Sequence, residues 1–503
     1  MLFSVSRSPV ARRRTIRRLT VGILAASVAV GACGSTDPGV SARRSSDAGN
    51  IDLPDSGTTP PPSSVEPNAN DATIDFGANK QPQPYDDFLQ ASLADIQDYW
   101  RETFPQLYGS PFEELQGGIW ASYPDRTEPL PTGCGGDPNE QYVAQGNAFY
   151  CGNGDYIVYD DFDLIPGITQ LYGNSAVGVV FAHEFGHAIQ ARVNAIPSDP
   201  VVYREQQADC FAGAWTAHVA RGESKLLTFD DKDVKSGLLA MVLVKDSELG
   251  ADVFQGGAHG TAFDRVGAFQ HGFIGGAKAC KDMETNPLPL LNLQFTDQQD
   301  VQNKGNLEYD KINTDVVGDL ERFWKQTFTN LVGHPFNPPK VSSYPHGGPF
   351  PSCDGIDEKS YPFNALYCPS TNEIVYDEAF ARTLYNKVGD FAVGYILSDA
   401  YGDAVQAQWP SSLKGEKRSL LSDCLTGMWT RDTIPPPNGG TVPDDHLIVI
   451  SPGDLDEAVS TALLIGDSGF NSNVVGSAFE KIDSFRAGVL GGFDECQKRI
   501  TGG

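Results

Sequence analysis

The stretch AVGVVFAHEFGHAIQARV, at residues 176–193, has a counterpart later in the chain, AVGYILSDAYGDAVQAQW, at residues 392–409. Apolar residues recur in both at the spacing of an α-helix, so both stretches predict helices. Gly186 and Gly402 stand at the same place in the two stretches. Because a glycine inside a helix costs about 1 kcal/mol relative to alanine, we expect each of them to allow close packing against a neighbouring element.

The repetition extends over most of the chain. DIQDYWRETFPQLYGSPF from Asp95 is repeated as DLERFWKQTFTNLVGHPF from Asp319, and ADCFAGAWT is repeated as SDCLTGMWT. The segments keep the same order in both copies, and a chain of 503 residues is too long for one ordinary core. We therefore predict two tandem α+β domains at 86–285 and 306–503, joined by a connector at 286–305.

The repeat also predicts how the cysteines pair. Eight cysteines follow Cys33, and each copy carries four of them at matching positions. An even set in an exported chain indicates disulfides and an oxidising compartment. A thiolate metal site is the alternative, but the chain contains no Cys-x-x-Cys pair. The predicted pairs are Cys134–Cys151, Cys210–Cys280, Cys353–Cys368 and Cys424–Cys496.

Residues 1–32 have the pattern of an export signal, in which six arginines precede the apolar run LTVGILAASVAVGA. The segment VGAC resembles the lipobox of bacterial lipoproteins, which predicts cleavage before Cys33 and a lipid on that cysteine. An ordinary signal peptidase site is the alternative. The Ser-, Pro- and Asp-rich residues 33–85 predict a flexible tether. We therefore expect an exported protein, lipid-anchored at the outer face of the cell membrane, by either the general or the twin-arginine route.

The chain is strongly acidic. Its formal net charge is −28, and removal of the six arginines of the signal makes it −34. Phosphate contacts come from basic patches, so we expect no nucleic-acid partner. After the signal, no stretch reaches the roughly 18 apolar residues that a membrane-spanning helix needs. The lipid is therefore the membrane attachment that we expect, and the oligomeric state stays open.

His183, Glu184 and His187 form a His-Glu-x-x-His pattern on the first predicted helix. Residues four apart lie on one face of a helix, so the two imidazoles can bind a single metal ion. Zinc with one open position lowers the pKa of a bound water to about 7, and a neighbouring carboxylate can then take its proton. The pattern therefore predicts one Zn²⁺, with Glu184 as the general base of a hydrolysis.

Several ordered motifs resemble one known family. AHEFGHAIQ, EQQADCFAGAW and AHGTAFDRVGAFQHGF together resemble the neutral zinc metallopeptidases of the YpfJ type, and the lipobox and tether resemble the actinobacterial lipoprotein peptidases of the LpqM type. The segment EQQAD is similar to the Glu-x-x-x-Asp helix of gluzincin peptidases. The resemblance implies a zincin-like fold, Glu205 as the third zinc ligand and Asp209 as a residue that supports a ligand. For Asp209, which recurs as Asp423, a purely structural hydrogen bond is the alternative.

The second copy lacks the residues that this chemistry needs. At the positions of the two histidines and the base it has Asp399, Asp403 and Ala400, and Glu205 falls on Ser419 or within two residues of it. The distant His259 is replaced there by Val475. We therefore predict zinc in the first domain only and a degenerate second domain. For His259 we predict stabilisation of the oxyanion that forms during hydrolysis, the alternative being a hydrogen bond that positions a helix.

These observations predict a lipid-anchored zinc peptidase whose substrate is a protein or a peptide. The alternative is an envelope lipoprotein that binds or scaffolds a partner through a peptidase-like fold. In the second domain, Asp399 and Asp403 could hold a hard cation such as calcium, although two solvated carboxylates are the simpler interpretation. We also expect DYIVYDD, at residues 155–161, to form an exposed strand edge on which an extended peptide can pair.

Overall fold

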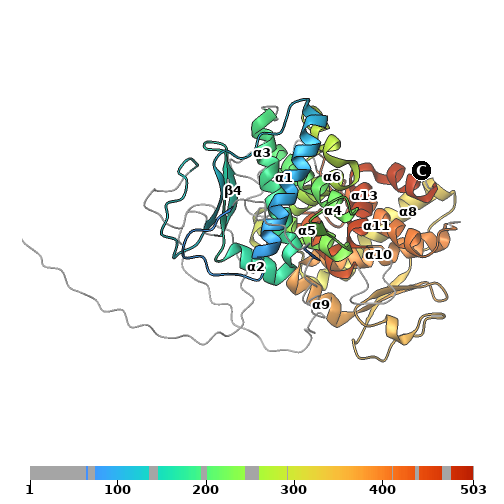
Figure 1. The fold of residues 1–503 in the computed structure, drawn as a ribbon. Coiled ribbons are helices and arrows are strands. Elements are labelled where there is room, and N and C mark those ends of the chain that lie inside the picture. The colour runs from blue at the N-terminus through green and yellow to red at the C-terminus, as the bar shows by residue number, and fades with distance from the viewer. Residues whose placement is uncertain are drawn as a thin grey trace, which may run out of the picture. The chain divides into compact units, whose positions relative to one another are not determined.

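The computed structural model describes residues 64–65, 74–134, 146–193, 201–243, 260–291, 293–409, 412–436, 441–466 and 477–501. The predicted signal, Cys33, most of the tether and His259 lie outside these residues. Helices dominate both copies of the repeat, and each copy also contains a small sheet (Figure 1). The fold is therefore α+β, as predicted. The predicted domain boundaries stay predictions.

The first copy sets a four-stranded sheet beside a group of helices. The strand order is β2-β3-β5-β4; β2, β3 and β5 run parallel, and β4 is antiparallel to β5. A separate two-stranded ladder joins β1 (Ser64–Val65) to β6 (Leu227–Thr228). The other elements are β2 (Ile74–Asp75), α1 (Asp86–Tyr108), β3 (Gly118–Ser122), β4 (Ala148–Cys151), β5 (Tyr156–Asp160), α2 (Leu164–Tyr172), α3 (Asn174–Val193), α4 (Val202–Ala220), α5 (Asp231–Leu243) and α6 (Ala262–Asp282).

The second copy repeats this order after the short helix α7 (Gln298–Gln302). Its sheet has the order β7-β9-β8, with β7 and β9 parallel and β8 antiparallel to β9, as for β3, β5 and β4. Its elements are the short helices η2 (Tyr309–Lys311), η3 (Ile312–Val316) and η4 (Glu358–Ser360), the strands β7 (Lys340–Tyr344), β8 (Ala365–Cys368) and β9 (Glu373–Asp377), and the helices α8 (Val317–Val332), α9 (Glu378–Lys387), α10 (Asp390–Gln408), α11 (Glu416–Asp432), α12 (Asp454–Ile465) and α13 (Ala478–Thr501).

The expectation of an exposed strand edge at DYIVYDD is wrong. This segment forms β5, which is paired on both sides, with β3 and with β4, and all five of its residues are buried. A continuous apolar run is typical of such a strand, because both of its faces are covered. Among the described residues, the outer strand on this side of the sheet is β4, which lies against α3.

Glycines let the central helices approach one another closely in both copies. A Cβ at Gly186 in α3 would lie 2.7 Å from Cα of Ala208 in α4, and one at Gly402 in α10 would lie 2.8 Å from Cα of Ser422 in α11. This contact confirms the expectation for both glycines. Similarly, a Cβ at Gly213 in α4 would lie 1.9 Å from the carbonyl oxygen of Phe269 in α6. The helices therefore pack backbone to backbone, and side chains larger than hydrogen do not fit at these positions.

All four predicted disulfides are present. Cys210–Cys280 joins α4 to α6, the pair that Gly213 brings together. Cys424–Cys496 joins α11 to α13, where a Cβ at Gly427 would lie 2.0 Å from the carbonyl oxygen of Phe485. Cys134–Cys151 ties the end of β4 to the preceding loop, and Cys353–Cys368 does the same for β8. The matching pairs give both copies the same covalent frame.

The two copies contact each other through α6, α12 and α13 (Figure 1). The backbone N–H of Phe263 donates to Oδ1 of Asp456 at 2.9 Å, and the side chain of Gln270 donates to the carbonyl of Phe479 at 2.8 Å. The guanidinium of Arg486 stacks on the Phe263 ring, 4.0 Å from its centre. The start of α6 is therefore held by the second copy. No helix in the described part of the chain combines the length and apolar character needed to cross a bilayer.

Candidate metal centre

Two histidines of α3 face the same point. His183 and His187 lie one helical turn apart, and their Nε2 atoms are 3.1 Å from each other. His183 is only 6% exposed, although it is a polar residue. A buried imidazole normally has partners for both ring nitrogens. The short distance between two nitrogens that are both potential acceptors indicates that they are placed for a common ligand.

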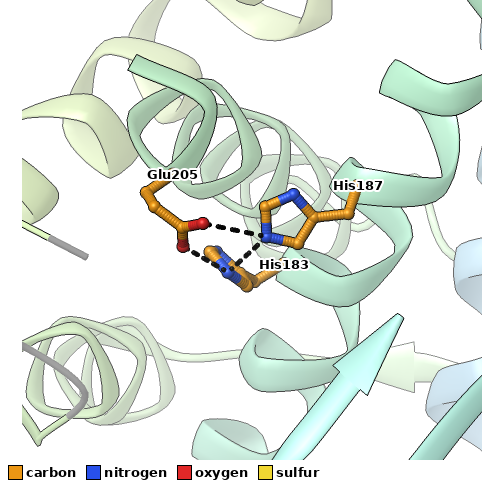
Figure 2. A group of neighbouring side chains, drawn as sticks. All are labelled: His183, His187 and Glu205. Carbon is orange, nitrogen blue, oxygen red and sulfur yellow. Dashed lines mark hydrogen bonds and ion pairs between the residues drawn. The ribbon is translucent and has the colours of Figure 1, made fainter. Parts of the chain in front are cut away.

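Glu205, in the first turn of α4, completes the group (Figure 2). Its Oε2 lies 3.4 Å from Nε2 of His183, and its Oε1 lies 3.6 Å from Nε2 of His187. One ligand atom from each of the three residues falls within 4.8 Å of the others. Two imidazole nitrogens and a carboxylate oxygen are a ligand set that zinc prefers, and three protein ligands leave a position open. The residues present therefore fit zinc.

The outer nitrogen of each imidazole is held as well. Nδ1 of His183 donates to Oδ1 of Asp209 at 2.7 Å, and Nδ1 of His187 donates to Oε1 of Gln190 at 2.9 Å. A proton on Nδ1 leaves the lone pair of Nε2 free to face the metal position. The structure thus places Asp209 against His183, in the supporting position that the family resemblance implied. Arg265 in turn donates to both carboxylate oxygens of Asp209, at 2.7 and 2.8 Å.

The electrostatics of the group favour a positive charge between its members. Burial acts to lower the pKa of His183, but the Asp209 and Glu205 carboxylates outweigh it and raise that pKa to about 10. Burial acts to raise the pKa of Glu205, but the two histidines hold it well below its usual value. A metal cation meets the same demand for positive charge as a protonated imidazole does.

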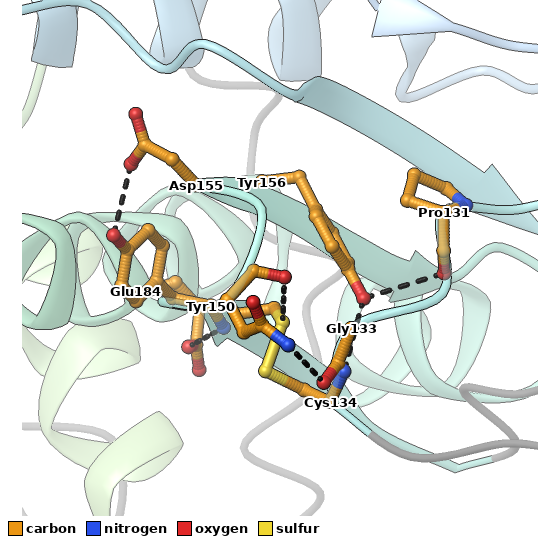
Figure 3. Close-up of a disulfide and its surroundings, with 9 residues drawn as sticks. Pro131, Gly133, Cys134, Tyr150, Asp155, Tyr156 and Glu184 are labelled. Carbon is orange, nitrogen blue, oxygen red and sulfur yellow. Dashed lines mark hydrogen bonds between the residues drawn. A yellow bond between two sulfur atoms is a disulfide. The ribbon is translucent and has the colours of Figure 1, made fainter.

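Glu184 follows His183 in α3, and its carboxylate is held from the sheet (Figure 3). Its Oε2 accepts the backbone N–H of Tyr150 in β4 at 2.7 Å, and the residue is only 6% exposed. Burial raises its pKa, against the opposing influence of His183 and His187. The Tyr150 hydroxyl donates to Oδ1 of Asp155 at 2.8 Å. The strand that carries this N–H is tied at Cys151 by the disulfide to Cys134, so the carboxylate position is fixed from outside the helix.

Sequence reasoning found the four central residues and Asp209, but missed three supports. Arg265, Gln190 and the N–H of Tyr150 were not among the candidates. Comparison of the two copies could have indicated two of them, because their residue type is kept in the second copy: Arg265 matches the basic Lys481, and Gln190 matches Gln406. The N–H of Tyr150 left no such signal, because every residue type except proline offers one. The role predicted for His259 stays a prediction, since that residue lies outside the described part of the chain.

The matching place in the second copy holds paired charges. Lys481 donates to Oδ2 of Asp423 at 2.8 Å, and the hydroxyl of Tyr395 donates to Oδ1 of Asp423 at 2.7 Å, where His183 contacts Asp209 in the first copy. Asp403 forms an ion pair with Arg418 at 3.2 Å. Asp399 is half-buried; burial raises its pKa well above its usual value, and the charge of Lys481 opposes this. Lys481 and Arg418 already supply positive charge to these carboxylates. Calcium binding by Asp399 and Asp403 is therefore disfavoured.

Two histidines one turn apart, a glutamate from the next helix and the buried Glu184, which lies between the histidines in the sequence, form a candidate metal centre with the His-Glu-x-x-His pattern. The family model described as "Putative neutral zinc metallopeptidase" matches residues 57–283 and again residues 290–490. The chain belongs to this family. The second match covers the copy that lacks counterparts of His183 and His187, so both copies match the same family model.

The similar curated proteins are named without a function. "Uncharacterized protein YpfJ" of Escherichia coli K12 is 28% identical over 198 residues, which are 36% of this chain and 63% of the relative. "Uncharacterized protein Rv2575" of Mycobacterium tuberculosis H37Rv is 29% identical over 137 residues, which are 24% of this chain and 45% of the relative. The match thus spans less than two thirds of either relative. No solved structure matches the chain.

Proposed function

We propose that the first copy is a zinc-dependent peptidase that acts outside the cytoplasm. The observation that carries this proposal is the convergence of His183, His187 and Glu205 on one point, with the buried Glu184 next to His183 in α3. The four disulfides support an oxidising, extracytoplasmic location. We extend the proposal to a lipid on Cys33, which would keep the enzyme at the outer face of the membrane on its tether.

The chain's own contribution to hydrolysis is proton transfer by Glu184. When bound, zinc supplies a Lewis acid that polarises the peptide carbonyl and lowers the pKa of water. The Glu184 carboxylate takes a proton from the attacking water and delivers it to the nitrogen of the leaving amine. Burial raises the pKa of this carboxyl, which favours its acceptance of a proton. The bond from Tyr150 N–H keeps the carboxylate in place, and His259 is the proposed partner of the oxyanion.

The proposed substrate is an extended segment of a protein or peptide that lies along β4. This strand is the outer strand of the sheet among the described residues, and it lies against the helix that carries the histidines. Backbone pairing on such an edge, at positions other than the N–H of Tyr150 that Glu184 occupies, holds a peptide without regard to most of its side chains. We therefore place the peptide one strand further out than DYIVYDD, on a strand that contacts Glu184 directly.

The direct test is the substitution Glu184→Gln. It removes the proton acceptor but keeps the size and hydrogen-bond capacity of the side chain, so we expect kcat for a peptide-library substrate to fall by about 10²- to 10⁴-fold. Zinc content, measured by mass spectrometry, should stay at one ion per chain. Glu223→Gln, which changes an exposed acid on the same domain, is the control. Equal cleavage by the Glu184→Gln variant and the wild type would refute the proposed function.

A further inference from the structure

A second group of carboxylates lies in the second copy, away from the lost histidine positions. It consists of Asp390 at the start of α10 and of Asp454 and Glu457 in the first turn of α12, with one oxygen of each within 4.8 Å of the others. Asp390 is 7% exposed and Asp454 is 5% exposed. Burying charged carboxylates this close together costs much free energy unless a cation or protons compensate them.

Backbone groups fix each of the three carboxylates. Oδ2 of Asp390 accepts the N–H of Leu307 at 2.9 Å, Oδ2 of Asp454 accepts that of Ser451 at 2.7 Å, and Oε2 of Glu457 accepts that of Phe391 at 2.8 Å. The other oxygen of Asp390, Oδ1, is buried and accepts no hydrogen bond. A buried acceptor of this kind is rare in a folded protein and calls for an explanation.

The surroundings supply negative charge. Burial raises the pKa of Asp390 to about 6, and the charge of Asp300 adds to this effect. Burial raises the pKa of Asp454 further, together with the charges of Asp390 and Glu457. The chief influences on both groups are therefore burial, backbone N–H groups and other acids. This distinguishes the cluster from Asp399 and Asp403, which face Lys481 and Arg418.

The backbone makes room for the cluster. Gly389 precedes Asp390 with φ at 147°, in a region that favours glycine. A Cβ at this position would lie 1.8 Å from Oε1 of Glu457. A larger residue would displace Glu457 from the group, so the glycine permits the close approach of α10 and α12.

The first copy has only one acid at the corresponding place. Asp454 matches Asp233, because each caps its helix by accepting the N–H of the residue three positions earlier, at 2.7 and 2.9 Å. The residues in the first copy that correspond to Asp390, Asp454 and Glu457 are Asn174, Asp233 and Ser236. The capping aspartate is thus common to both copies, and two further carboxylates occur only in the copy that lacks the zinc ligands.

We propose that Asp390, Asp454 and Glu457 bind a calcium ion. The ligand atoms are all oxygens, which hard cations prefer, and calcium accepts the irregular arrangements that carboxylates on separate segments produce. An extracytoplasmic location suits such a site, because extracellular calcium modules work with dissociation constants of about 10⁻⁴ to 10⁻³ M. The proposal does not depend on peptidase activity.

The ion would join three segments and reach the first copy. It would hold the start of α10, the start of α12 and, through Asp390, the N–H of Leu307. Between the two α12 ligands stands Asp456, which accepts the N–H of Phe263 at the start of α6. Two residues further along α6 is Arg265, which holds Asp209 behind the histidines. Calcium is therefore expected to stabilise the contact between the copies as well as the second copy.

The test uses the full chain, stripped of metals and reloaded with one equivalent of zinc. We expect equilibrium dialysis with radioactive calcium to find one ion per chain, and 1 mM CaCl₂ to raise Tm by roughly 1–5 °C. The variant Asp390→Asn/Glu457→Ser, which introduces the residues of the first copy, should lose both effects. Asp98→Asn/Glu102→Ser removes the same charge from exposed positions of α1 and should keep them.

Three results would overturn the proposal. They are a wild type that binds no calcium, a Tm shift of equal size in wild type and in the Asp390→Asn/Glu457→Ser variant, and an equal shift with 1 mM MgCl₂. Without calcium the variant should be at least as stable as the wild type, because repulsion between carboxylates is relieved. If the double variant does not fold, the single variant Glu457→Gln replaces it, and its calcium binding and Tm shift are compared with those of the wild type.

Discussion

The helices α3 and α10 occupy matching places in the two copies but carry different polar side chains, His183 and His187 in α3 and Asp399 and Asp403 in α10. Both helices pack against the next helix in the same way. Gly186 and Gly402 make matching contacts with α4 and α11. A buried aspartate on the next helix pairs with a basic residue in both, Asp209 with Arg265 and Asp423 with Lys481. The scaffold therefore does not need the metal in order to form.

A tryptophan contact makes the same point. Trp215 donates to Asp95 at 2.8 Å, and Trp429 donates to Asp319 at 2.9 Å, so α4 is anchored to α1 in the same way as α11 is to α8. Within this shared packing, the second copy lacks the side chains that reach the metal position in the first. The comparison separates residues that build the fold from residues that serve a metal, without reference to any other protein.

The strongest way to break the comparison is to convert the first copy into the second. The double substitution His183→Asp/His187→Asp removes both nitrogen ligands, and we expect zinc binding to fall below detection by mass spectrometry while circular dichroism stays unchanged. The reverse change, Asp399→His/Asp403→His, should not create a second zinc site, because Ser419 cannot replace Glu205 and Lys481 stands nearby. A second zinc ion in that variant would show that the scaffold alone determines metal binding.

Asp209→Asn tests the support behind His183. The change keeps a hydrogen-bond acceptor but removes the charge that favours Nδ1–H on the imidazole, so zinc affinity should weaken by about 10- to 100-fold. Competition with a chromophoric chelator measures this. The matched control is Asp423→Asn, which should leave zinc affinity at the wild-type value. Equal weakening by both substitutions would mean that zinc binding merely follows the stability of the fold.

The paired glycine substitutions should affect stability equally. An added methyl group at Gly186→Ala or Gly402→Ala meets backbone less than 3 Å away, so we expect each to reduce the free energy of unfolding by about 1–3 kcal/mol. Denaturant titration measures both. A loss confined to Gly186→Ala would indicate that this glycine serves the metal centre and not the shared packing.

Tyr395→Phe should have the smallest effect. It removes the hydroxyl that donates to Asp423 at 2.7 Å, in the position that His183 takes against Asp209. A hydrogen bond to a charged group contributes about 1.5 kcal/mol or somewhat more, and we expect a loss of that size in thermal unfolding. Zinc content should not change. A variant as stable as the wild type would mean that Lys481 alone satisfies Asp423.

Much of the centre was predictable because its signals are local or repeated. His183 and His187 are one turn apart on a single helix, and a strong helical pattern places such residues together. The disulfides followed from comparing the two copies, since matching cysteines must occupy matching positions. Glu205 came from a resemblance. The edge strand was assigned wrongly, because a continuous apolar run does not reveal whether its neighbours lie on one side or on both.

The sequence by itself determined the helix that carries the histidines, the pairing of the cysteines and the loss of the ligand set from the second copy. These follow from periodicity and from internal comparison, which need no knowledge of distant contacts. Only the tertiary structure decided which backbone N–H holds Glu184, that Arg265 stands behind Asp209, and that Asp390 meets Asp454 and Glu457. Such contacts join residues tens of positions apart through packing of whole elements, and no local pattern encodes the distance between them.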